Sequence, residues 1–540
     1  MKVKRFAAFL SVLVLAAPLF AGGGGQAQGG RQATAPTLGT GRISYPVNTD
    51  VTLTYWTGLT PALQGTITNM SETAFARGLQ ERTGIKLEFL HPPSATINEQ
   101  FNMIVASRDF PDIMEHNWLL FPGGPERAID EGIIVPLNDY LESYAPNLTD
   151  YLRANPRHDR MVKTDAGTYF VFPFIRGDDR LCVFNGIYIR QDWLDEFGLD
   201  VPVTFDDWHR MLTVFRDRKG VAPLAIGLTL DDRWFSNFVW GLGIARDWYL
   251  GDDGRVRWGG IEPAFRYFVE TMARWYREGL IDPDFVSLTH PQIAQRMTTG
   301  RAGVSVGNLG RDMGGWTPVA RTADPAFRLV AVQPPVRNRG DQIRMLQIDN
   351  PFTGLGTPAI TTANRNRELT ARLFDWGYSP EGYTYHNFGV QGVAHTMVNG
   401  IPTYTPEITS NPRGWSMSTA IAFHARASYN GPFVQSFEYQ LQFFALPEQA
   451  AAPDIWMRGI ADPFRHRVPP ITPSASEATQ MAQIMNSVNT YFQESLTRFI
   501  LGTDPINDTT WNNYVRTIEQ YGIQRAIDIQ NAALGRFNNR

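Results

Sequence analysis

In the first patterned part of the chain, stretches in which every second residue is apolar alternate with stretches in which apolar residues have helical spacing. In VTLTYW, which begins at Val51, and in IKLEFL, which begins at Ile85, every second residue is apolar, and this predicts two strands. Residues 71–82 between them are typical of a helix. A second helix is predicted from Asn98, and PDIM at 111–114 follows it as a short third strand. The opening order is therefore βαβαβ.

Aromatic and polar residues stand where these three predicted strands end. Trp56 closes the first strand, His91 follows the second, and Asn117 with Trp118 follows the third. A βαβαβ order favours a parallel sheet with right-handed crossovers, and ligands of open α/β sheets bind beyond the carboxyl ends of the strands. We therefore expect one edge of this sheet to carry aromatic and polar side chains.

Capping patterns predict the longer helices of the rest of the chain. Thr204 and Asp207 form a Thr-x-x-Asp capping box before an apolar periodic run, and Ser474 with Glu477 repeats the pattern before the last helical region. Pro263 suits the first position of a further long helix. The second half of the chain therefore mixes strands with helices and becomes mostly helical after Ser474.

The N-terminal residues have the pattern of a secretory signal peptide. Lys2, Lys4 and Arg5 precede an apolar run over residues 6–20, and small residues follow. Residues 1–21 are thus expected to be a cleaved signal, and the Gly, Gln and Ala rich residues 22–46 a flexible tether. No later stretch of about 18 uninterrupted apolar residues predicts a membrane span.

Composition then excludes several classes of function. The chain has 540 residues, 43% of them hydrophobic, so it is long enough for two or more domains. Its 49 Lys and Arg nearly balance 53 Asp and Glu, and without a basic block no nucleic-acid partner is expected. Cys182, the only cysteine, lies in an apolar segment and is expected to be an inert buried thiol. No HExxH, EF-hand or phosphate-binding loop occurs, so neither a cofactor nor a metal is expected.

One catalytic pattern matches by its letters. Gly303, Ser305 and Gly307 satisfy the G-x-S-x-G nucleophile elbow, which needs a strand before the serine and a helix directly after it. The glycine-interrupted NLGRDMGGW that follows is a poor helix start, so the pattern favours an ordinary strand over a hydrolase. No catalytic residue is therefore assigned.

Aromatic residues in segments typical of loops point to sugar binding. Sugar rings lay their apolar faces on aromatic planes, while their hydroxyls pair with Asp, Asn or Arg. Core packing remains the alternative for each tryptophan, and a solvated loop remains the alternative for Asp178. The candidate ligand-binding residues are Trp56, Trp118, Tyr169, Asp178, Trp234, Trp316 and Asn387.

Several longer segments resemble a known family, the extracellular solute-binding proteins of family 1, in particular the long ABC transporter substrate-binding proteins linked to complex-carbohydrate and aldouronate uptake. These segments are ASRDFPDIM, IDEGIIVPLNDYL, YIRQDWLDEFGLDVPVTFDDW, YREGLIDPDF, TGRAGV and ARLFDWGYSPEGYTYHNFGVQG. Two positions depart from the family. Gly22 stands where many relatives have a lipid-bearing cysteine, and Gln391 stands where relatives often have Glu, which leaves the charge of the sugar open.

The resemblance implies an α/β, two-lobed periplasmic-binding-protein fold with a hinge, an interlobe cleft and a helical C-terminal region. Lobe 1 is expected over 47–166, lobe 2 over 167–345, a return to lobe 1 or the hinge over 346–410, and helices packing on the lobes over 411–540. The implied function is capture of a carbohydrate, an oligosaccharide, by hinge closure. The implied partners are the ABC permease subunits of the inner membrane, and the protein is expected to be a periplasmic monomer.

Two other classes of function compete with this one. A secreted carbohydrate-active hydrolase would convert the sugar to products, whereas a binding protein would leave the sugar intact. A surface adhesion or scaffolding module would bind no sugar in a cleft of its own. Incubation of the purified protein with oligosaccharides separates these classes.

Overall fold

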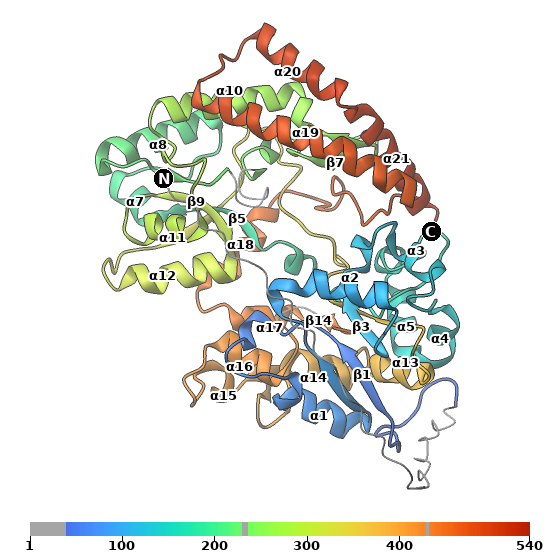
Figure 1. The fold of residues 1–540 in the computed structure, drawn as a ribbon. Coiled ribbons are helices and arrows are strands. Elements are labelled where there is room, and N and C mark those ends of the chain that lie inside the picture. Colours follow the sequence, from blue (N-terminus) through green and yellow to red (C-terminus); the bar gives the residue numbers. More distant parts are fainter. Residues whose placement is uncertain (1–38, 229–235, 428–430) are drawn as a thin grey trace, which may run out of the picture. The chain divides into compact units, whose positions relative to one another are not determined.

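Two four-stranded sheets organise the residues that this computed structural model describes, which are 39–228, 236–427 and 431–540 (Figure 1). The first sheet has the order β11-β3-β1-β2. Its strands β1 (Thr52–Trp56), β2 (Lys86–Leu90) and β3 (Ile113–His116) are parallel, and β11 (Thr357–Ile360) joins β3 in the antiparallel direction. The parallel βαβαβ opening predicted from the sequence is therefore confirmed.

The first helix starts later than its apolar pattern predicts. Helix α1 spans Ala74–Thr83, whereas the residues before it form a separate 3-10 turn, Met70–Glu72. Thr73 lies between them in an extended conformation, and its side chain accepts the Ala76 N–H. This cap fixes the helix start, and Gly84, with φ of 75°, ends the helix.

The second sheet has the order β10-β5-β9-β6. Strand β5 (Asn185–Arg190) lies between β9 (Val304–Asn308) and β10 (Leu329–Val332), antiparallel to both, and β6 (Leu224–Ala225) runs parallel to β9. Each sheet has its own apolar core. The chain therefore has two α/β lobes, which we call the first and the second lobe after their sheets.

Short strands far apart in the sequence pair where the chain passes from the first sheet to the second. Strand β4 (Ile175–Arg176) lies parallel to β14 (Val434–Gln435). The Gly177 N–H also donates to the Gln435 carbonyl at 3.0 Å. The remaining strands form two hairpins: β7 (Trp248–Leu250) with β8 (Val256–Trp258), and β12 (His395–Val398) with β13 (Ile401–Tyr404).

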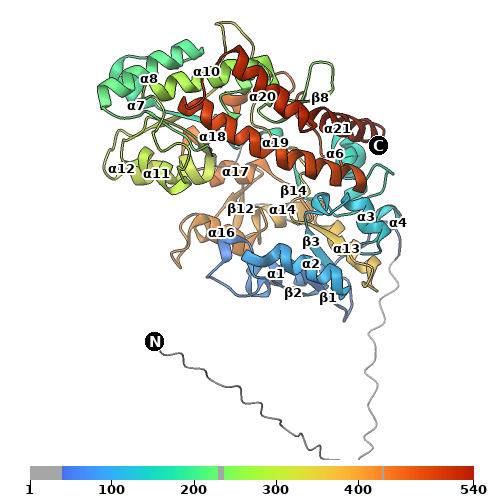
Figure 2. The same ribbon diagram turned by 45° about the horizontal axis from the view of Figure 1, so that its top comes forward.

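Helices cover both sheets, and three long helices at the end of the chain pack on the second lobe. Helix α19 (Ala475–Leu501) lies beside α10 (Pro263–Arg277) in both views (Figures 1 and 2). Capping boxes begin α8 (Phe205–Lys219) and α19, as the sequence predicts. The other α-helices are α2 (Ile97–Ser107), α3 (Gly124–Asp130), α4 (Asn138–Tyr144), α5 (Pro146–Ala154), α6 (Pro156–Met161), α7 (Gln191–Phe197), α11 (His290–Thr298), α12 (Gly314–Arg321), α13 (Arg367–Trp376), α14 (Pro380–Phe388), α15 (Pro406–Thr409), α16 (Met417–His424), α17 (Phe437–Phe443), α18 (Pro447–Met457), α20 (Asp508–Gln520) and α21 (Ile523–Asn538).

The segment after β9 is helical, so the expectation of a poor helix start there is wrong. A π-helical turn, Leu309–Met313, leads directly into α12. The buried Asp312 carboxylate holds this turn, because it accepts the Asn308 N–H at 2.6 Å and lies 2.6 Å from His290 Nε2. Tertiary contacts thus outweigh the low helix propensity of the glycines.

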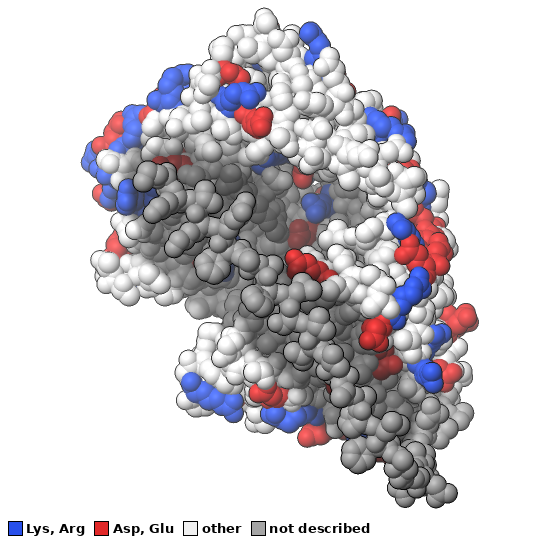
Figure 3. All heavy atoms as spheres, viewed as in Figure 1, with Lys and Arg blue, Asp and Glu red and all other residues white. Residues whose placement is uncertain are grey.

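None of the helices in the described ranges combines the length and the apolar character that crossing a membrane requires. On the face that Figure 3 shows, Lys and Arg are interspersed with Asp and Glu. Cys182 is buried, and burial raises the pKa of its thiol to about 12, in agreement with the predicted inert cysteine.

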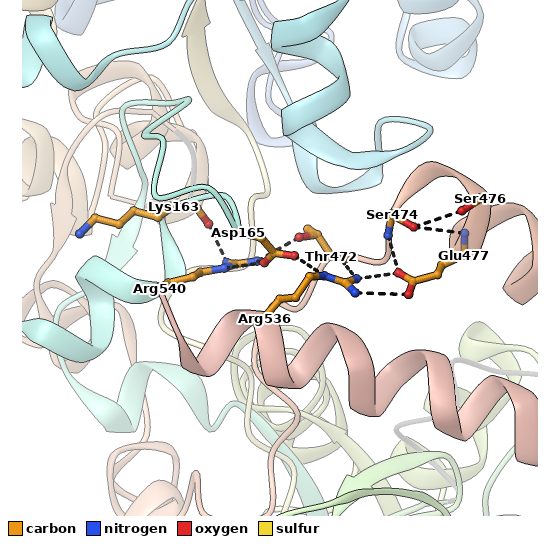
Figure 4. Close-up of polar contacts among 8 residues, drawn as sticks. All are labelled: Lys163, Asp165, Thr472, Ser474, Ser476, Glu477, Arg536 and Arg540. Carbon is orange, nitrogen blue, oxygen red and sulfur yellow. Dashed lines mark hydrogen bonds and ion pairs between the residues drawn. The ribbon is translucent and has the colours of Figure 1, made fainter.

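An ion-pair network around Asp165 ties the last helix to the first lobe (Figure 4). The Asp165 carboxylate accepts bonds of 2.7 Å from both Arg536 and Arg540, and the Arg540 side chain is fully buried. Arg536 also donates to Glu477 at 2.6 Å, and Arg540 donates to the Lys163 carbonyl at 2.6 Å. Asp165 and Glu477 together therefore balance the charge of the two guanidinium groups, and Asp165 contacts both of them.

We expect Asp165→Asn to lower the free energy of unfolding by about 1.5–3 kcal/mol, because the amide keeps an acceptor oxygen but loses the charge that both arginines face. Urea denaturation measures the loss. Asp150→Asn is the control, since Asp150 pairs with arginines while about half exposed and should contribute less than about 1 kcal/mol. Equal losses in the two variants would contradict the role given to Asp165.

His386 makes the stability of the first lobe depend on pH. Its ring is buried on α14 with Nδ1 2.8 Å from the Gly382 carbonyl, and burial lowers its pKa to about 3. The unfolded chain binds a proton near pH 6.5, whereas the folded chain does not, so stability falls as the pH falls below about 6.5. From pH 7 to pH 5, wild type should lose about 2 kcal/mol more than His386→Gln does in urea denaturation. An equal pH dependence of the two proteins would refute this assignment.

Candidate functional site

Two of the predicted ligand residues lie together at the expected edge of the first sheet. Trp56 ends β1 and Trp118 follows β3, and Phe101 of α2 lies 6.2 and 5.4 Å from their rings, measured between centroids. His116 stacks on the same Phe101 ring at 3.8 Å. Trp56 is 4% exposed and Trp118 is fully buried. The strand ends therefore bring the aromatic rings together, but the rings pack against one another.

Two more predicted residues flank the paired strands β4 and β14. Asp178 caps the 3-10 helix Asp179–Cys182 and accepts bonds of 2.8 and 2.7 Å from Arg180, which lowers the pKa of Asp178. Asn387 is fully buried, donates to the Val434 carbonyl at 2.9 Å and accepts the Ser436 N–H at 2.8 Å. Both side chains support the segment that links the lobes.

The other three predicted residues lie elsewhere. The Tyr169 hydroxyl donates to Asp159 at 2.5 Å in the first lobe, and burial raises the pKa of Tyr169. Trp316 on α12 is 4% exposed, with its ring 6.1 Å from His290. Trp234 lies outside the described residues. Direct contact of these seven residues with a ligand stays a prediction.

A cavity of about 300 Å³ lies among residues of the second lobe and two segments that approach it from far along the chain. Two tryptophans, Trp240 and Trp248, line it, and we call it the tryptophan cavity. Trp240 is 8% exposed and belongs to the apolar core of the second lobe, and Trp248 packs on the same core while only partly buried. The other residues that line the tryptophan cavity are Ser236, Ala245, Asp247, Met345, Leu346, Gln347, Ile348, Asp349, Pro463, His466 and Arg467.

Charged groups surround the tryptophans in this cavity. Asp349 lies 3.6 Å from Arg176 and 3.9 Å from Arg467, so it is held near two guanidinium groups. Gln347 accepts the N–H groups of Phe184 and Asn185 and is thereby fixed beside Asp349. Gln347 thus helps to hold the Asp349 carboxylate in place at the cavity.

The hydrogen bond of His466 defines which of its ring nitrogens can accept a bond from a ligand in the tryptophan cavity. Its Nδ1 lies 2.8 Å from the Leu250 carbonyl, which can only accept, so in the neutral ring Nδ1 carries the proton. Nε2 is then an acceptor. Together with Arg467 it gives the cavity a donor and an acceptor beside two apolar planes, which is the chemistry that a sugar ring requires.

Trp240 and Trp248 are not among the residues predicted from the sequence, although the same signal applies to them. Trp240 precedes Gly241 and Trp248 follows Asp247, so both stand beside the loop residues that singled out other tryptophans. The polar residues of the cavity could not be found in this way. Asp349 and Arg467 are more than 100 positions apart in the sequence, and only the fold brings them together.

The pattern around Ser305 is not a nucleophile elbow. Ser305 is the second residue of β9, away from the turn into the helix, and its side chain is fully buried. Its hydroxyl donates to the Ala225 carbonyl at 2.7 Å. Ser305 therefore completes the pairing of two strands, as the strand interpretation predicts.

The chain is similar to substrate-binding proteins of transporters. No protein-family model matches it. The fructooligosaccharide ABC transporter substrate-binding protein FusA of Streptococcus pneumoniae is 21% identical over 98% of both chains. The polygalacturonan/rhamnogalacturonan-binding protein YtcQ of Bacillus subtilis is 23% identical over 43% of this chain and 46% of its own length.

Solved structures give the same fold. FusA in complex with kestose has a TM-score of 0.69 at 19% identity, and covers 91% of this chain and 100% of its own. The alginate-binding protein AlgQ2, in a crystal structure without calcium ion, has a TM-score of 0.68 at 23% identity, and covers 91% and 99%. An EF-hand mutant of FusA is also similar, but no three His, Cys, Asp or Glu side chains in the described ranges of this chain converge to hold a metal ion. The chain is thus a homologue of ABC transporter substrate-binding proteins, and its two α/β lobes have the fold of the solute-binding proteins.

Proposed function

We propose that the chain is the exported solute-binding component of an ABC importer and that it binds a carbohydrate in the tryptophan cavity. The observation that carries this proposal is that two indole rings line one cavity together with a carboxylate, an imidazole and a guanidinium. Sugars need apolar planes and a few fixed polar groups, and the cavity supplies both. The homologues described above support the same class of function.

An oligosaccharide suits the space better than a single sugar. A second cavity of about 420 Å³ shares His466 with the tryptophan cavity and is lined by Asp252, Arg344, Asp462 and Arg465, among others. A ligand longer than one ring can therefore continue past His466. Each cavity falls within the size range of small-molecule sites.

Closure of the two lobes is the step that we expect to follow binding. The strands β4 and β14 and the segment 345–349 link the sheets, so rotation about them would change the distance between the lobes. A sugar shifts the equilibrium toward the closed form only if it binds that form more tightly. The partners of the closed form would be permease subunits of the inner membrane, and the protein itself would act as a monomer.

Export to the periplasm rests on the signal pattern, which lies outside the described residues. We expect residues 1–21 to be removed during export and the new terminus to carry no lipid, because Cys182 is the only cysteine. Intact-mass measurement of periplasmic protein tests both points. A mass that still includes Met1, or an added diacylglyceryl group, would overturn them.

A thermal-shift screen against neutral and acidic oligosaccharides tests the function. A sugar at about 100 times its Kd should stabilise the protein by about 2.7 kcal/mol. Mass spectrometry of the recovered sugar then separates a binding protein, which returns it intact, from a hydrolase, which returns products. An adhesion or scaffolding module would give no shift with any sugar.

A further inference from the structure

The helix α21 belongs to the apolar cores of both lobes. Ile523 and Ala526 in its first turn lie in the core of the second lobe, and Phe537 near its end lies in the core of the first lobe. Each of these three side chains is at most 4% exposed. Because an α-helix has a fixed rise per residue, one rigid element of constant length joins the two cores.

The middle of α21 is bonded to the second lobe. The Asn531 side-chain amide accepts the Val256 N–H at 2.9 Å and donates to the Val256 carbonyl at 3.0 Å, as a neighbouring strand would. Val256 lies in β8, so this pair holds the helix against the β7–β8 hairpin. Arg536 follows about 8 Å further along the helix axis. The helix therefore passes from one lobe to the other within this short distance.

The end of α21 is held in the first lobe by buried contacts (Figure 4). Asp165 bonds to both Arg536 and Arg540, and its side chain is 13% exposed, so solvent ions screen these pairs weakly. The Arg540 guanidinium also lies 4.7 Å from the centre of the Phe537 ring. We call Asp165, Arg536, Phe537 and Arg540 the helix anchor.

The lobes are thus joined both by the linking strands β4 and β14 and by the helix anchor. A body that is held at two separate places can turn only about the line through both. Rotation about another axis would pull Phe537 out of the first-lobe core or separate Asp165 from its arginines. Both changes are unfavourable, because they expose a buried ring or leave buried charges unpaired.

We infer that the helix anchor is a pivot of lobe closure, which stays intact while the lobes turn about a line through it and the linking strands. This inference rests on the lobe closure of the proposed function and adds the axis of that movement. Parts of the two lobes near the anchor should keep their separation when a sugar binds, and parts far from it should approach each other. Helix α3 lies near the end of α21 in both views, whereas α12 and α16 lie on the opposite side (Figures 1 and 2).

Distances between spin labels on pairs of introduced cysteines, measured by pulsed EPR on the full chain, test the inference. Asp130→Cys on α3 with Thr479→Cys on α19 is the near pair, and Ser410→Cys after α15 with Val319→Cys on α12 is the far pair. All four positions are exposed, whereas the native Cys182 is buried with its thiol protonated and does not compete for the label.

The sugar probes are kestose, tetragalacturonate and any other oligosaccharide that stabilises the protein in the thermal-shift screen. A sugar that binds should shorten the far pair and leave the near pair at its distance in the free protein. A near pair that shortens as much as the far pair would overturn the pivot.

Release of the anchor tests the restraint without any sugar. Arg536→Ala, Phe537→Ala and Arg540→Ala together should widen the distance distribution of the near pair, because the helix end no longer holds the first lobe. Asp165→Asn keeps the packing and should widen it less, and it gives the comparison if the triple variant does not fold. Arg525→Ala is the matched control, since Arg525 is exposed at the second-lobe end of the same helix and should leave the distribution as in wild type.

The outcomes separate this inference from the proposed function. A released variant that keeps the wild-type distribution of the near pair would overturn the inference and leave carbohydrate binding in place. A bound sugar that leaves the far pair unchanged would contradict the closure step and, with it, the pivot. Failure of every sugar to bind would instead contradict the carbohydrate function, and the sugar-free comparison would still decide whether the anchor restrains the lobes.

Discussion

Trp248→Ala is expected to weaken carbohydrate binding by about 1–3 kcal/mol, the range for a ring that stacks on an indole face. Trp248 lines the tryptophan cavity and is only partly buried. The free energy of unfolding should therefore fall by much less than the roughly 3–5 kcal/mol that loss of a buried tryptophan costs. Calorimetric titration with a sugar from the screen and urea denaturation measure the two effects separately.

Trp415→Ala is the control for this experiment. Trp415 is also partly buried, but its ring packs on Phe423 at 5.0 Å and below the Arg413 guanidinium at 4.7 Å, and it lines neither the tryptophan cavity nor the cavity beyond His466. Its removal should leave the sugar affinity unchanged. If Trp248→Ala also binds with wild-type affinity, the tryptophan cavity is not the sugar site.

The second large effect concerns the core of the first lobe. Arg426→Ala is expected to lower the free energy of unfolding by about 3–5 kcal/mol, because it leaves the Glu115 charge buried without its partner. Arg426 lies 3.2 Å from both Glu115 oxygens, and the Glu115 side chain is 1% exposed. The Tyr55 hydroxyl donates to the same carboxylate. Burial and this carboxylate raise the pKa of Tyr55 well above its ordinary value, so Tyr55 stays a donor.

A double variant separates the lost pair from lost packing. Arg426→Met with Glu115→Gln removes both charges and keeps similar volumes, so it should be more stable than Arg426→Ala alone. Urea denaturation of the three proteins gives the comparison. A loss below about 1 kcal/mol in Arg426→Ala, the size typical of an exposed pair, would show that Glu115 does not depend on Arg426.

Local patterns predicted much of the fold. The parallel strands β1, β2 and β3 follow from period-two alternation, and the starts of α8 and α19 follow from capping boxes that involve residues only three positions apart. Such signals act within one segment, so one sequence is enough to find them. The helix after β9 was not predicted, because it depends on a contact between Asp312 and His290, which are 22 positions apart in the sequence.

The site was harder to predict for the same physical reason. Trp118 and Trp248 both follow polar residues, but Trp118 is fully buried against Phe101 of another helix, whereas Trp248 is only partly buried and lines a cavity. Which tryptophan faces a cavity is therefore decided by distant segments. The charged groups Asp349 and Arg467 likewise reach the site through segments that join only in the folded chain.

A crystal structure of the protein with an oligosaccharide from the thermal-shift screen tests directly whether the tryptophan cavity binds carbohydrate. We expect an intact sugar with one ring against Trp240 or Trp248 and with hydroxyl groups bonded to Asp349, His466 or Arg467. A sugar bound at another surface, with the tryptophan cavity free of sugar, would show that this cavity is not the binding site.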